Sequence, residues 1–211
     1  MNKSRITKPK ASTKENKAST AKKRKILNDQ LSHTQPVYFW HAEDDDGYLG
    51  QWYQAPFTWR KPVNDGGEAE ELVYQTAEQY MMHHKALLFA PDSPITAQIL
   101  AAGQPAPHPR QLKKLGRQVP NFSDDVWKRE RYGIVLQGNL LKFSQNPDLK
   151  QKLLATGDRE LVEASPRDRI WGIGFGKVKA GQNRERWGLN LLGKCLMEAR
   201  RQLKEEDTGL S

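Results

Sequence analysis

Cysteine is almost missing from this chain, and long apolar runs are missing altogether. The 211 residues contain one cysteine, Cys195, so no disulfide can form within the chain, which fits a reducing compartment. No stretch approaches the roughly 20 apolar residues that a membrane span requires. The first residues also lack the apolar centre of a secretory signal. We therefore expect a cytoplasmic or nuclear protein that makes no contact with a membrane.

Motifs that hold metals or nucleotides are missing as well. The five histidines show no metal-ligand spacing, and one cysteine cannot supply the zinc motif of a deaminase. The chain has neither a Walker-type phosphate loop nor a Gly-x-Ser-x-Gly turn. Gly172, Gly174 and Gly176 do not form a dinucleotide fingerprint, because the third glycine comes one residue early. We expect neither a metal nor a cofactor.

Positive charge is concentrated near the N-terminus. Residues 1–30 carry ten Lys and Arg against Glu15 and Asp29, a net charge of +8, whereas the whole chain carries +9. Residues 31–211 therefore contribute only +1, and the high pI does not describe a basic folded body. Residues 1–33 have almost no large apolar side chains, so we expect a disordered basic tail. Its Lys22-Lys-Arg-Lys25 run is a solvated segment, a nuclear address or a phosphate-binding arm.

Apolar periodicity and turn residues predict an α+β fold, mainly helical, with a small sheet. Strands are expected at 37–40, 57–59, 72–74 and 161–163, and a turn at 64–67 should join the middle two. Helices are expected at 77–89, 94–100, 110–116, 124–143 and 147–154, and a glycine-rich loop at 172–181. A last helix should bury the apolar face that consists of Leu189, Leu192, Leu196, Ala199 and Leu203.

Glu78 and Lys85 are the first candidates for chemistry. They are seven residues apart on one predicted helix, nearly two turns, so they share a face. Aromatic, methionine and histidine side chains fill the stretch between them, so this face should be covered, and buried charges need partners or a task. The alternative is a solvated charge pair that contributes little. The residues alone leave both interpretations open.

Further candidates lie in the second half of the chain. Asp168 is either the cap of a turn or a carboxylate beside an indole at the edge of a cleft. Trp127 and Trp171 either stack on a base or belong to the core. Asn190 and Gly193 lie near the start of the last helix, whose terminal amides can bind an anion. Close helix packing is the alternative explanation of Gly193.

Carboxylates, a lysine, aromatic rings and glycine turns suit the cleavage of an N-glycosidic bond. The transition state of that reaction is cationic at the anomeric carbon, and a fixed carboxylate stabilises it or activates water. Aromatic rings can hold the departing base. A desolvated lysine offers a second route, because its amine can attack the anomeric carbon and form a Schiff base with the opened sugar.

The chain resembles the NADAR family of YbiA-like N-glycosidases over roughly residues 37–206. The motifs that carry the resemblance are Trp52-Tyr-Gln-Ala-Pro-Phe57, Glu78 with Tyr80 and Lys85, Gly116-Arg117, Trp127 with Arg131, Lys142-Phe-Ser-Gln-Asn-Pro147, Leu153-Leu-Ala-Thr-Gly157, Glu163-Ala-Ser-Pro-Arg-Asp168, Trp171-Gly-Ile-Gly174 and Asn190-Leu-Leu-Gly193. One departure is visible, because members often have Ser-Asn where this chain has Gly50-Gln51. The resemblance implies a single YbiA-like catalytic domain, placed here at residues 34–207, and a metal-independent N-glycosidase or ADP-ribosyl hydrolase.

The resemblance also implies roles for particular residues. Glu78 would be the catalytic carboxylate, Lys85 a nucleophile or electrostatic partner, and Asp168 a sugar-positioning or acid–base group. Arg117 and Arg131 would contact phosphates by charge-assisted hydrogen bonds. The full set of expected substrate-binding residues is Gln51, Trp52, Tyr80, Arg117, Trp127, Arg131, Asn146, Trp171, Gly172, Gly174 and Asn190.

Known activities of the family leave two substrates open. One is ADP-ribosylated guanine in DNA, and the other is a phosphoribosyl-amino-pyrimidine intermediate of riboflavin synthesis. The basic tail suits DNA phosphates, so we expect ADP-ribose on guanine in DNA as the substrate. A non-catalytic ADP-ribose-binding module is the alternative of another class, although a protein that only binds would not need both Glu78 and Lys85. The sequence does not indicate an oligomeric state.

Overall fold

The computed structural model describes residues 34–62, 69–102 and 109–209, called the described residues from here on. The chain divides into two units, Met1–Gln35 and Pro36–Ser211. The helices and strands named below all lie in the second unit. The basic tail expected at 1–33 and the turn expected at 64–67 lie outside the described residues.

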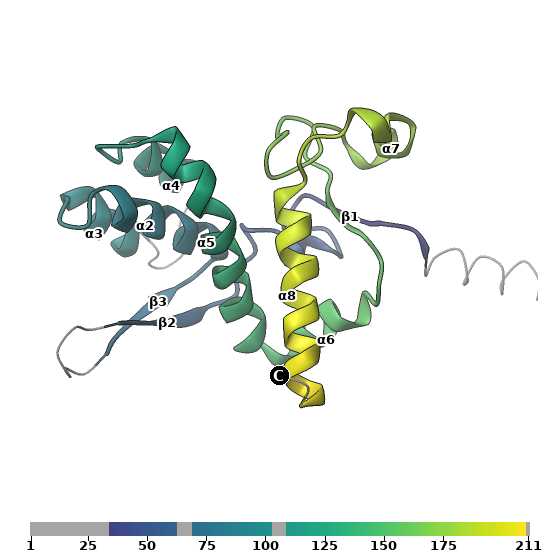
Figure 1. Cartoon of the computed structure of the whole chain (residues 1–211), viewed down its shortest axis with the longest axis horizontal. Coiled ribbons are helices and arrows are strands. Elements are labelled where there is room, and N and C mark those ends of the chain that lie inside the picture. Colours follow the sequence, from purple (N-terminus) through teal and green to yellow (C-terminus); the bar gives the residue numbers. More distant parts are fainter. Residues whose placement is uncertain (1–33, 63–68, 103–108, 210–211) are drawn as a thin grey trace, which may run out of the picture. The chain divides into compact units, whose positions relative to one another are not determined.

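The second unit is α+β and mainly helical, as the sequence predicts (Figure 1). Its strands are β1 (Val37–Phe39), β2 (Phe57–Lys61), β3 (Glu70–Tyr74) and β4 (Leu161–Glu163). Its helices are α2 (Ala77–Phe89), α3 (Pro94–Ala101), α4 (Pro109–Arg117), α5 (Asp124–Ser144), α6 (Pro147–Ala155), α7 (Lys177–Ala180) and α8 (Leu191–Thr208), with the 3-10 helices η1 (Gly47–Leu49) and η2 (Gly181–Arg186). The loop predicted at 172–181 is therefore wrong at its end, because α7 contains neither glycine nor proline and forms a turn of helix.

The strands form two separate two-stranded sheets in place of one small sheet. β1 and β4 pair in parallel, with Val37 opposite Leu161 and Phe39 opposite Glu163. β2 and β3 form the predicted antiparallel hairpin. The parallel pair joins the first strand of the unit to its last, so the residues that follow Phe39 lie beside those that follow Glu163. This non-local pairing forms one wall of the pocket described below.

The start of α2 is fixed by a side-chain cap that the sequence predicts. The hydroxyl of Thr76 accepts a hydrogen bond from the backbone N–H of Gln79 at 3.2 Å. Such a bond satisfies an amide that has no partner within the helix. Ser93 caps α3 in the same way through the N–H of Ile95. Because of the first cap, Glu78 lies in the first turn of α2.

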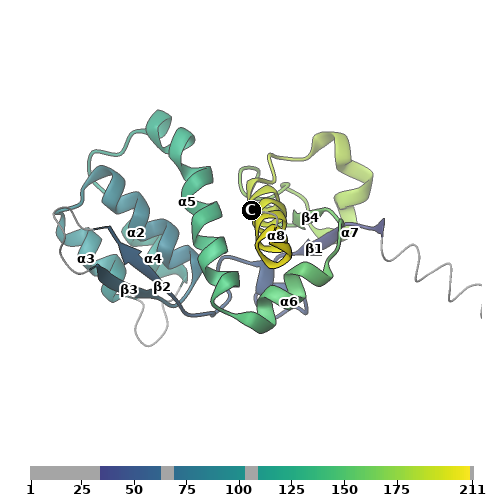
Figure 2. The ribbon, with the colours of Figure 1, turned by 60° about the horizontal axis from the view of Figure 1, so that its bottom comes forward.

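The long helix α5 packs against α2 on one side and α8 on the other (Figures 1 and 2). The apolar face of α8 is buried at Leu192, Leu196, Ala199 and Leu203, as predicted. Leu189 was predicted on this face but is 49% exposed. It precedes the helix, because α8 begins only after Asn190, whose backbone is left-handed with φ 49°.

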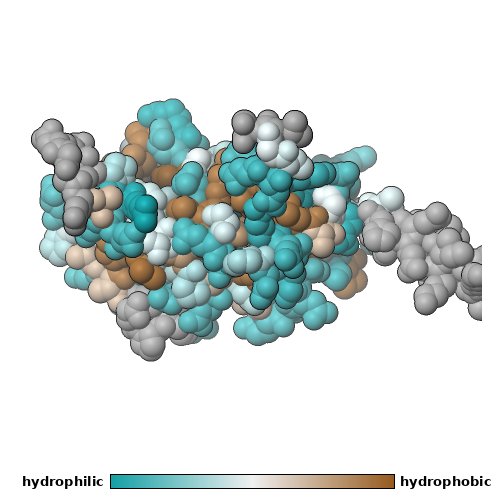
Figure 3. All heavy atoms as spheres, turned by 90° about the horizontal axis from the view of Figure 1, so that it is seen from below, coloured by the Kyte–Doolittle hydropathy of each residue, from teal (hydrophilic) through white to brown (hydrophobic). Residues whose placement is uncertain are grey.

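The surface of the unit is mostly hydrophilic. The face in Figure 3 shows hydrophobic side chains scattered among hydrophilic ones. Singly exposed apolar residues of this kind are usual on folded proteins. Among the described residues, no helix is both long and apolar enough to cross a membrane.

Candidate active site

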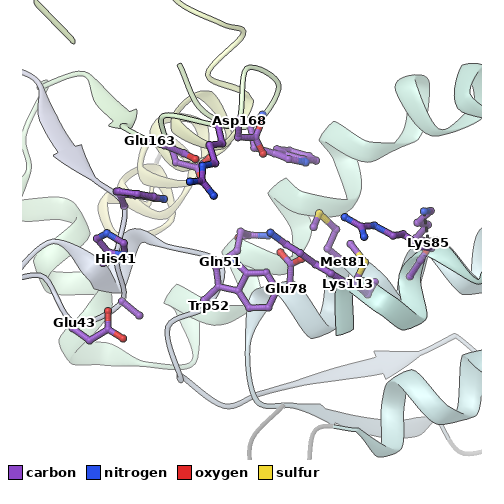
Figure 4. Close-up of a pocket in the computed structure, with 18 residues that line it drawn as sticks. His41, Glu43, Gln51, Trp52, Glu78, Met81, Lys85, Lys113, Glu163 and Asp168 are labelled. Atoms are coloured by element: carbon purple, nitrogen blue, oxygen red, sulfur yellow. Dashed lines mark hydrogen bonds between the residues drawn. The ribbon is translucent and has the colours of Figure 1, made fainter. Parts of the chain in front are cut away.

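A pocket of about 670 Å³ opens where the parallel strand pair meets α2 and α4. One side consists of residues that follow β1 and β4, and the other of the η1–β2 loop, the first turns of α2, and α4. Figure 4 shows Glu163 and Asp168 on one side and Glu78, Gln51 and Lys113 on the other. The volume lies in the range of sites that bind small molecules.

Glu78 is almost fully buried, with 4% of its surface exposed, and it lines the pocket. Its backbone N–H donates to the carbonyl oxygen of Gln51 at 3.0 Å. No described residue donates a hydrogen bond to its carboxyl group. Burial raises the pKa of Glu78 to about 7, while Lys113 acts to lower it and Asp168 to raise it. The glutamate predicted as the catalytic carboxylate is therefore near half ionisation at neutral pH.

Glu163 is a second carboxyl group in the pocket, and sequence reasoning did not select it. Burial, together with the negative charges of Asp168 and Glu78, raises its pKa to about 8, while Lys113 acts to lower it. Its Oε2 atom is enclosed and has no hydrogen-bond partner among the described residues. The sequence signal was weak, because a glutamate that ends a strand usually faces solvent.

Asp168 lines the same pocket but also stabilises a turn. Its Oδ1 accepts hydrogen bonds from the backbone N–H groups of Ile170 and Trp171, both at 2.8 Å. This is the capping geometry that the sequence left open as an alternative. Asp168 therefore positions Trp171 on the pocket wall, and its charge acts on both Glu78 and Glu163.

Gln51 presents a free donor on the opposite side. Its Oε1 accepts a hydrogen bond from Asn139 Nδ2 at 3.0 Å, while its own Nε2 is enclosed without a partner among the described residues. The loop that carries Gln51 is held by Lys142, whose Nζ donates to the carbonyl oxygens of Tyr48 at 2.6 Å and Gly50 at 3.0 Å. Gln51 can therefore donate to a ligand without first losing another hydrogen bond.

Lys142 is completely buried, which the sequence reasoning missed. Burial lowers the pKa of its amine to about 7. The only signal in the sequence is that Lys142 falls between apolar residues, after Leu140 and Leu141 and before Phe143. Its contact with two backbone carbonyls assigns it a role in shaping the loop beside Glu78.

Cations gather on the α2–α4 side of the pocket. Lys113 and Arg117 extend from α4, and the Nζ of Lys113 lies 5.0 Å from the ring centre of Trp52. Lys85 on α2 donates to the carbonyl oxygen of Gly116 at 2.8 Å, and burial lowers its pKa. Glu78 and Lys85 line one pocket, as their spacing predicts, but no ion pair between them is found among the described residues. The cation that acts on Glu78 is Lys113.

Two predicted binding residues support the backbone and do not line the pocket. Asn146 Nδ2 donates to the carbonyl oxygens of Pro56 at 3.1 Å and Lys142 at 2.8 Å. Asn190 accepts from the backbone N–H of Glu163 at 3.1 Å. Its amide also donates to the carbonyl oxygen of Leu161. These contacts fix the elements on which the pocket residues stand.

Three more predicted residues lie in the packing around the pocket. Tyr80 is 2% exposed and lies in the core against Tyr74. Gly172 allows a close backbone approach, because a Cβ there would lie 2.8 Å from the carbonyl oxygen of Glu163. Gly174 has a left-handed backbone with φ +76°, which a residue with a side chain rarely adopts. The glycines thus hold the wall beside Glu163.

Trp127 and Arg131 on α5 also lie outside the pocket lining. Trp127 packs against the main core, with its ring centre 5.9 Å from the Nζ of Lys85. The Nε of Arg131 is enclosed without a partner among the described residues. The predicted residues that do line the pocket are Gln51, Trp52, Glu78, Lys85, Arg117, Asp168 and Trp171.

No metal site is apparent from the described residues, since none of their His, Cys, Asp and Glu side chains form a group of three that could hold an ion. The expectation that the site needs no metal stays a prediction.

The class of this protein is defined by a mainly helical α+β unit in which the buried Glu78 and the partly buried Glu163 face one pocket. The chain matches the model of the NADAR domain over residues 38–204. It therefore belongs to the NADAR domain family, as its motifs indicate.

Similar proteins agree with this assignment. The chain is 46% identical over 154 residues to an N-glycosidase of Acanthamoeba polyphaga mimivirus, a match that covers 72% of this chain and 85% of that protein. It is 29% identical over 153 residues to the chloroplastic riboflavin biosynthesis protein PYRR of Zea mays, covering 71% of this chain and 22% of that protein. The NMR structure of Escherichia coli YbiA superposes with a TM-score of 0.58 at 26% identity, covering 82% of this chain and 88% of that one. The predicted YbiA-like fold is confirmed.

Proposed function

We propose that this protein hydrolyses the bond between ADP-ribose and guanine in DNA. At the coarser level the protein is a hydrolase that acts on N-glycosyl bonds, the class of its relatives that are named N-glycosidases. The observation that supports the chemistry is the pair of carboxyl groups of buried Glu78 and partly buried Glu163, which face one pocket from opposite sides.

Glu78 is suited to the central step. Cleavage of an N-glycosyl bond develops positive charge at the anomeric carbon, and a carboxylate in a desolvated site stabilises that charge or removes a proton from the attacking water. A pKa of about 7 leaves Glu78 partly ionised at neutral pH and makes it an effective base there. Asp168 adds a second negative charge to the same region.

The cations on the α2–α4 side suit the pyrophosphate of ADP-ribose. Lys113 and Arg117 lie on one helix and line the pocket, and no described acidic residue forms an ion pair with either. Hydrogen bonds from such groups to phosphate oxygens are charge-assisted and stronger than neutral ones. The indoles of Trp52 and Trp171 offer flat surfaces for a base. The pocket thus brings carboxyl groups, cations and flat aromatic rings together around one space.

Two considerations bear on the identity of the substrate. The charge of residues 1–30, a net +8 from ten basic and two acidic side chains, favours a substrate with many phosphates, such as DNA. The Zea mays relative named for riboflavin biosynthesis favours a second candidate, a phosphoribosyl-amino-pyrimidine intermediate of that pathway. Both candidates carry a ribosyl phosphate on a nitrogen base, so one pocket chemistry serves either.

The deciding experiment uses the whole chain and an oligonucleotide that carries ADP-ribosylated guanine. We expect free ADP-ribose and unmodified oligonucleotide, detected by mass spectrometry. No release, beside cleavage of the phosphoribosyl-amino-pyrimidine by the same preparation, would reject the DNA substrate and support the second candidate. Tight binding of ADP-ribose with no cleavage of either substrate would instead indicate a binding module.

Lys85 allows a test of whether an amine or a water molecule attacks the anomeric carbon. If its amine attacks the anomeric carbon, the opened sugar forms an imine, which borohydride reduces to a stable adduct. On that route, mass spectrometry of the trapped wild-type protein places this adduct on Lys85. The Lys85→Arg variant keeps the charge but cannot form the imine, so it should give no adduct. Continued turnover without any adduct in the wild type would favour direct attack by water.

The basic segment provides a test of DNA binding. Deletion of residues 1–33 is expected to weaken binding of modified DNA by tenfold or more at low salt, because phosphate contacts release counterions on binding. The dependence of affinity on salt should become less steep, while hydrolysis of a mononucleoside substrate stays within about twofold. Equal losses on the two substrates would contradict a separate role for this segment.

A further inference from the structure

We propose that Glu163 is a second catalytic residue, the general acid that donates a proton to the leaving base. This inference rests on the proposed hydrolysis of an N-glycosyl bond, and it assigns a step that Glu78 does not perform. It follows from the place of Glu163 on the pocket wall and from an enclosed carboxyl oxygen that has no hydrogen-bond partner among the described residues.

Both polar groups of the Glu163 backbone, the N–H and the carbonyl oxygen, form hydrogen bonds. Its N–H donates to Asn190 Oδ1 at 3.1 Å, and its carbonyl oxygen accepts from the N–H of Ile173 at 3.0 Å. The absence of a side chain at Gly172 lets the backbone approach this carbonyl. These contacts and the strand pairing with Phe39 fix the backbone of Glu163, which carries the carboxyl group on the wall opposite Glu78 (Figure 4).

The surroundings of the carboxyl group favour its neutral form. Oε2 is enclosed and receives no hydrogen bond from the described residues. An ionised carboxylate in that position would be desolvated and unpaired, which is costly, whereas protonation removes the charge. The neutral acid carries one O–H donor on a side chain that lines the pocket. The raised pKa of about 8 agrees with this interpretation.

The charges around the pocket separate the roles of the two glutamates. Of the surrounding charges, that of Lys113 acts most strongly on Glu78 and favours its ionised form. The charges of Asp168 and then of Glu78 act most strongly on Glu163 and favour its neutral form. Arg167 and His41 line the same pocket. The surrounding charges therefore favour the ionised form of Glu78 more than that of Glu163, as an acid–base pair requires.

The step balances as follows. The electron pair of the bond between the anomeric carbon and the base nitrogen moves to that nitrogen, which takes the proton of Glu163. Water adds to the anomeric carbon, and its proton passes to the carboxylate of Glu78. Transfer of that proton through solvent from Glu78 to Glu163 restores both groups. One water molecule is consumed, and the products are free ADP-ribose and an unmodified guanine that remains in the DNA.

The test compares Glu163→Gln with the wild type in the full chain. Glutamine keeps the shape of the side chain but has no acidic proton. We expect the single-turnover rate of ADP-ribose release to fall by 10²-fold or more, with less than a threefold change in the affinity for ADP-ribose. The wild-type rate should fall as the pH rises through about 8. The residual rate of Glu163→Gln should not show this fall. Glu130→Gln, an exposed change on α5, is the matched control.

A measurement without substrate makes the assignment independent of the DNA reaction. In protein with ¹³C-labelled glutamate carboxyl carbons, the signal lost in Glu163→Gln should titrate above pH 7. Titration below pH 5, or a rate within fivefold of the wild type, would overturn the proposal. If the wild type releases no ADP-ribose from DNA, the proposed DNA substrate is rejected, but the role of Glu163 as general acid is not. The same kinetic comparison on the phosphoribosyl-amino-pyrimidine then decides it.

Discussion

Replacement of Glu78 by glutamine is expected to lower the turnover number by about 10³-fold without loss of the fold. The amide neither stabilises a cationic transition state as a carboxylate does nor takes a proton from water. Single-turnover kinetics on the substrate that the wild type cleaves measures this effect. Turnover within tenfold of the wild type would remove Glu78 from the reaction. Because the change hardly alters size, binding of ADP-ribose should persist.

The same variant should be more stable than the wild type at alkaline pH. The pKa of Glu78 is raised in the folded state from 4.5 to about 7, so the folded state holds a proton that the unfolded chain has released. That contribution to stability is complete below pH 4.5 and is lost as the pH rises through 7. Urea unfolding at pH 8 should therefore show Glu78→Gln on the order of 2 kcal/mol more stable, with a smaller difference at pH 5. Equal gains at both values would contradict the burial of an ionisable group.

Replacement of Lys142 by methionine is expected to give the largest loss of stability. Methionine fills similar space but leaves the carbonyl oxygens of Tyr48 and Gly50 without their donor. Each buried acceptor without a donor costs about 1–3 kcal/mol. The loop that they shape carries Gln51, whose carbonyl oxygen anchors the N–H of Glu78. We therefore expect kcat/KM to fall about tenfold or more as well.

The pH dependence separates this variant from an ordinary core substitution. Burial lowers the pKa of Lys142 from 10.5 to about 7, so between these values the unfolded chain binds a proton that the folded state does not. Stability of the wild type should consequently rise by up to about 1.4 kcal/mol per pH unit in this window, and Lys142→Met should lack that contribution. Urea unfolding at pH 8 and pH 9 tests this slope. Lys152→Met is the control, since Lys152 is exposed and lies 5.7 Å from the same Tyr48 ring. A slope unchanged in Lys142→Met would contradict the inference.

The local features of the fold were predictable because they depend on neighbouring residues. Thr76 and Ser93 cap their helices through bonds to amides two or three residues away. The apolar face of α8 follows from a spacing within one helix. Leu189 was misplaced because α8 begins only after Asn190, which has a left-handed backbone and whose side chain is bonded to Glu163, 27 residues away. A periodic pattern carries no information about such a contact.

The candidate site was predictable to the extent that its residues are unusual in their own segments. Glu78 was selected because an acidic residue in a helix rich in aromatic and methionine side chains needs a partner or a function. Glu163 was not assigned a role, since its enclosure depends on the pairing with β1 and on the loop at Gly172. The partner of Lys85 was missed for the same reason, because the carbonyl of Gly116 reaches it only when α4 packs on α2.

The packing of α4 has a consequence for how this family can diverge. Leu112 anchors the helix in a small apolar cluster with Ala86, Ile99 and Val119, separate from the main core. The same helix presents Lys113 and Arg117 to the pocket, whereas Glu78 and Glu163 stand on other elements. Substitutions at exposed positions of α4 other than Lys113, which acts on both glutamates, can therefore accumulate with little effect on the acidic centre. During evolution, substitutions in α4 can therefore change which phosphorylated substrates bind while the hydrolytic residues stay the same.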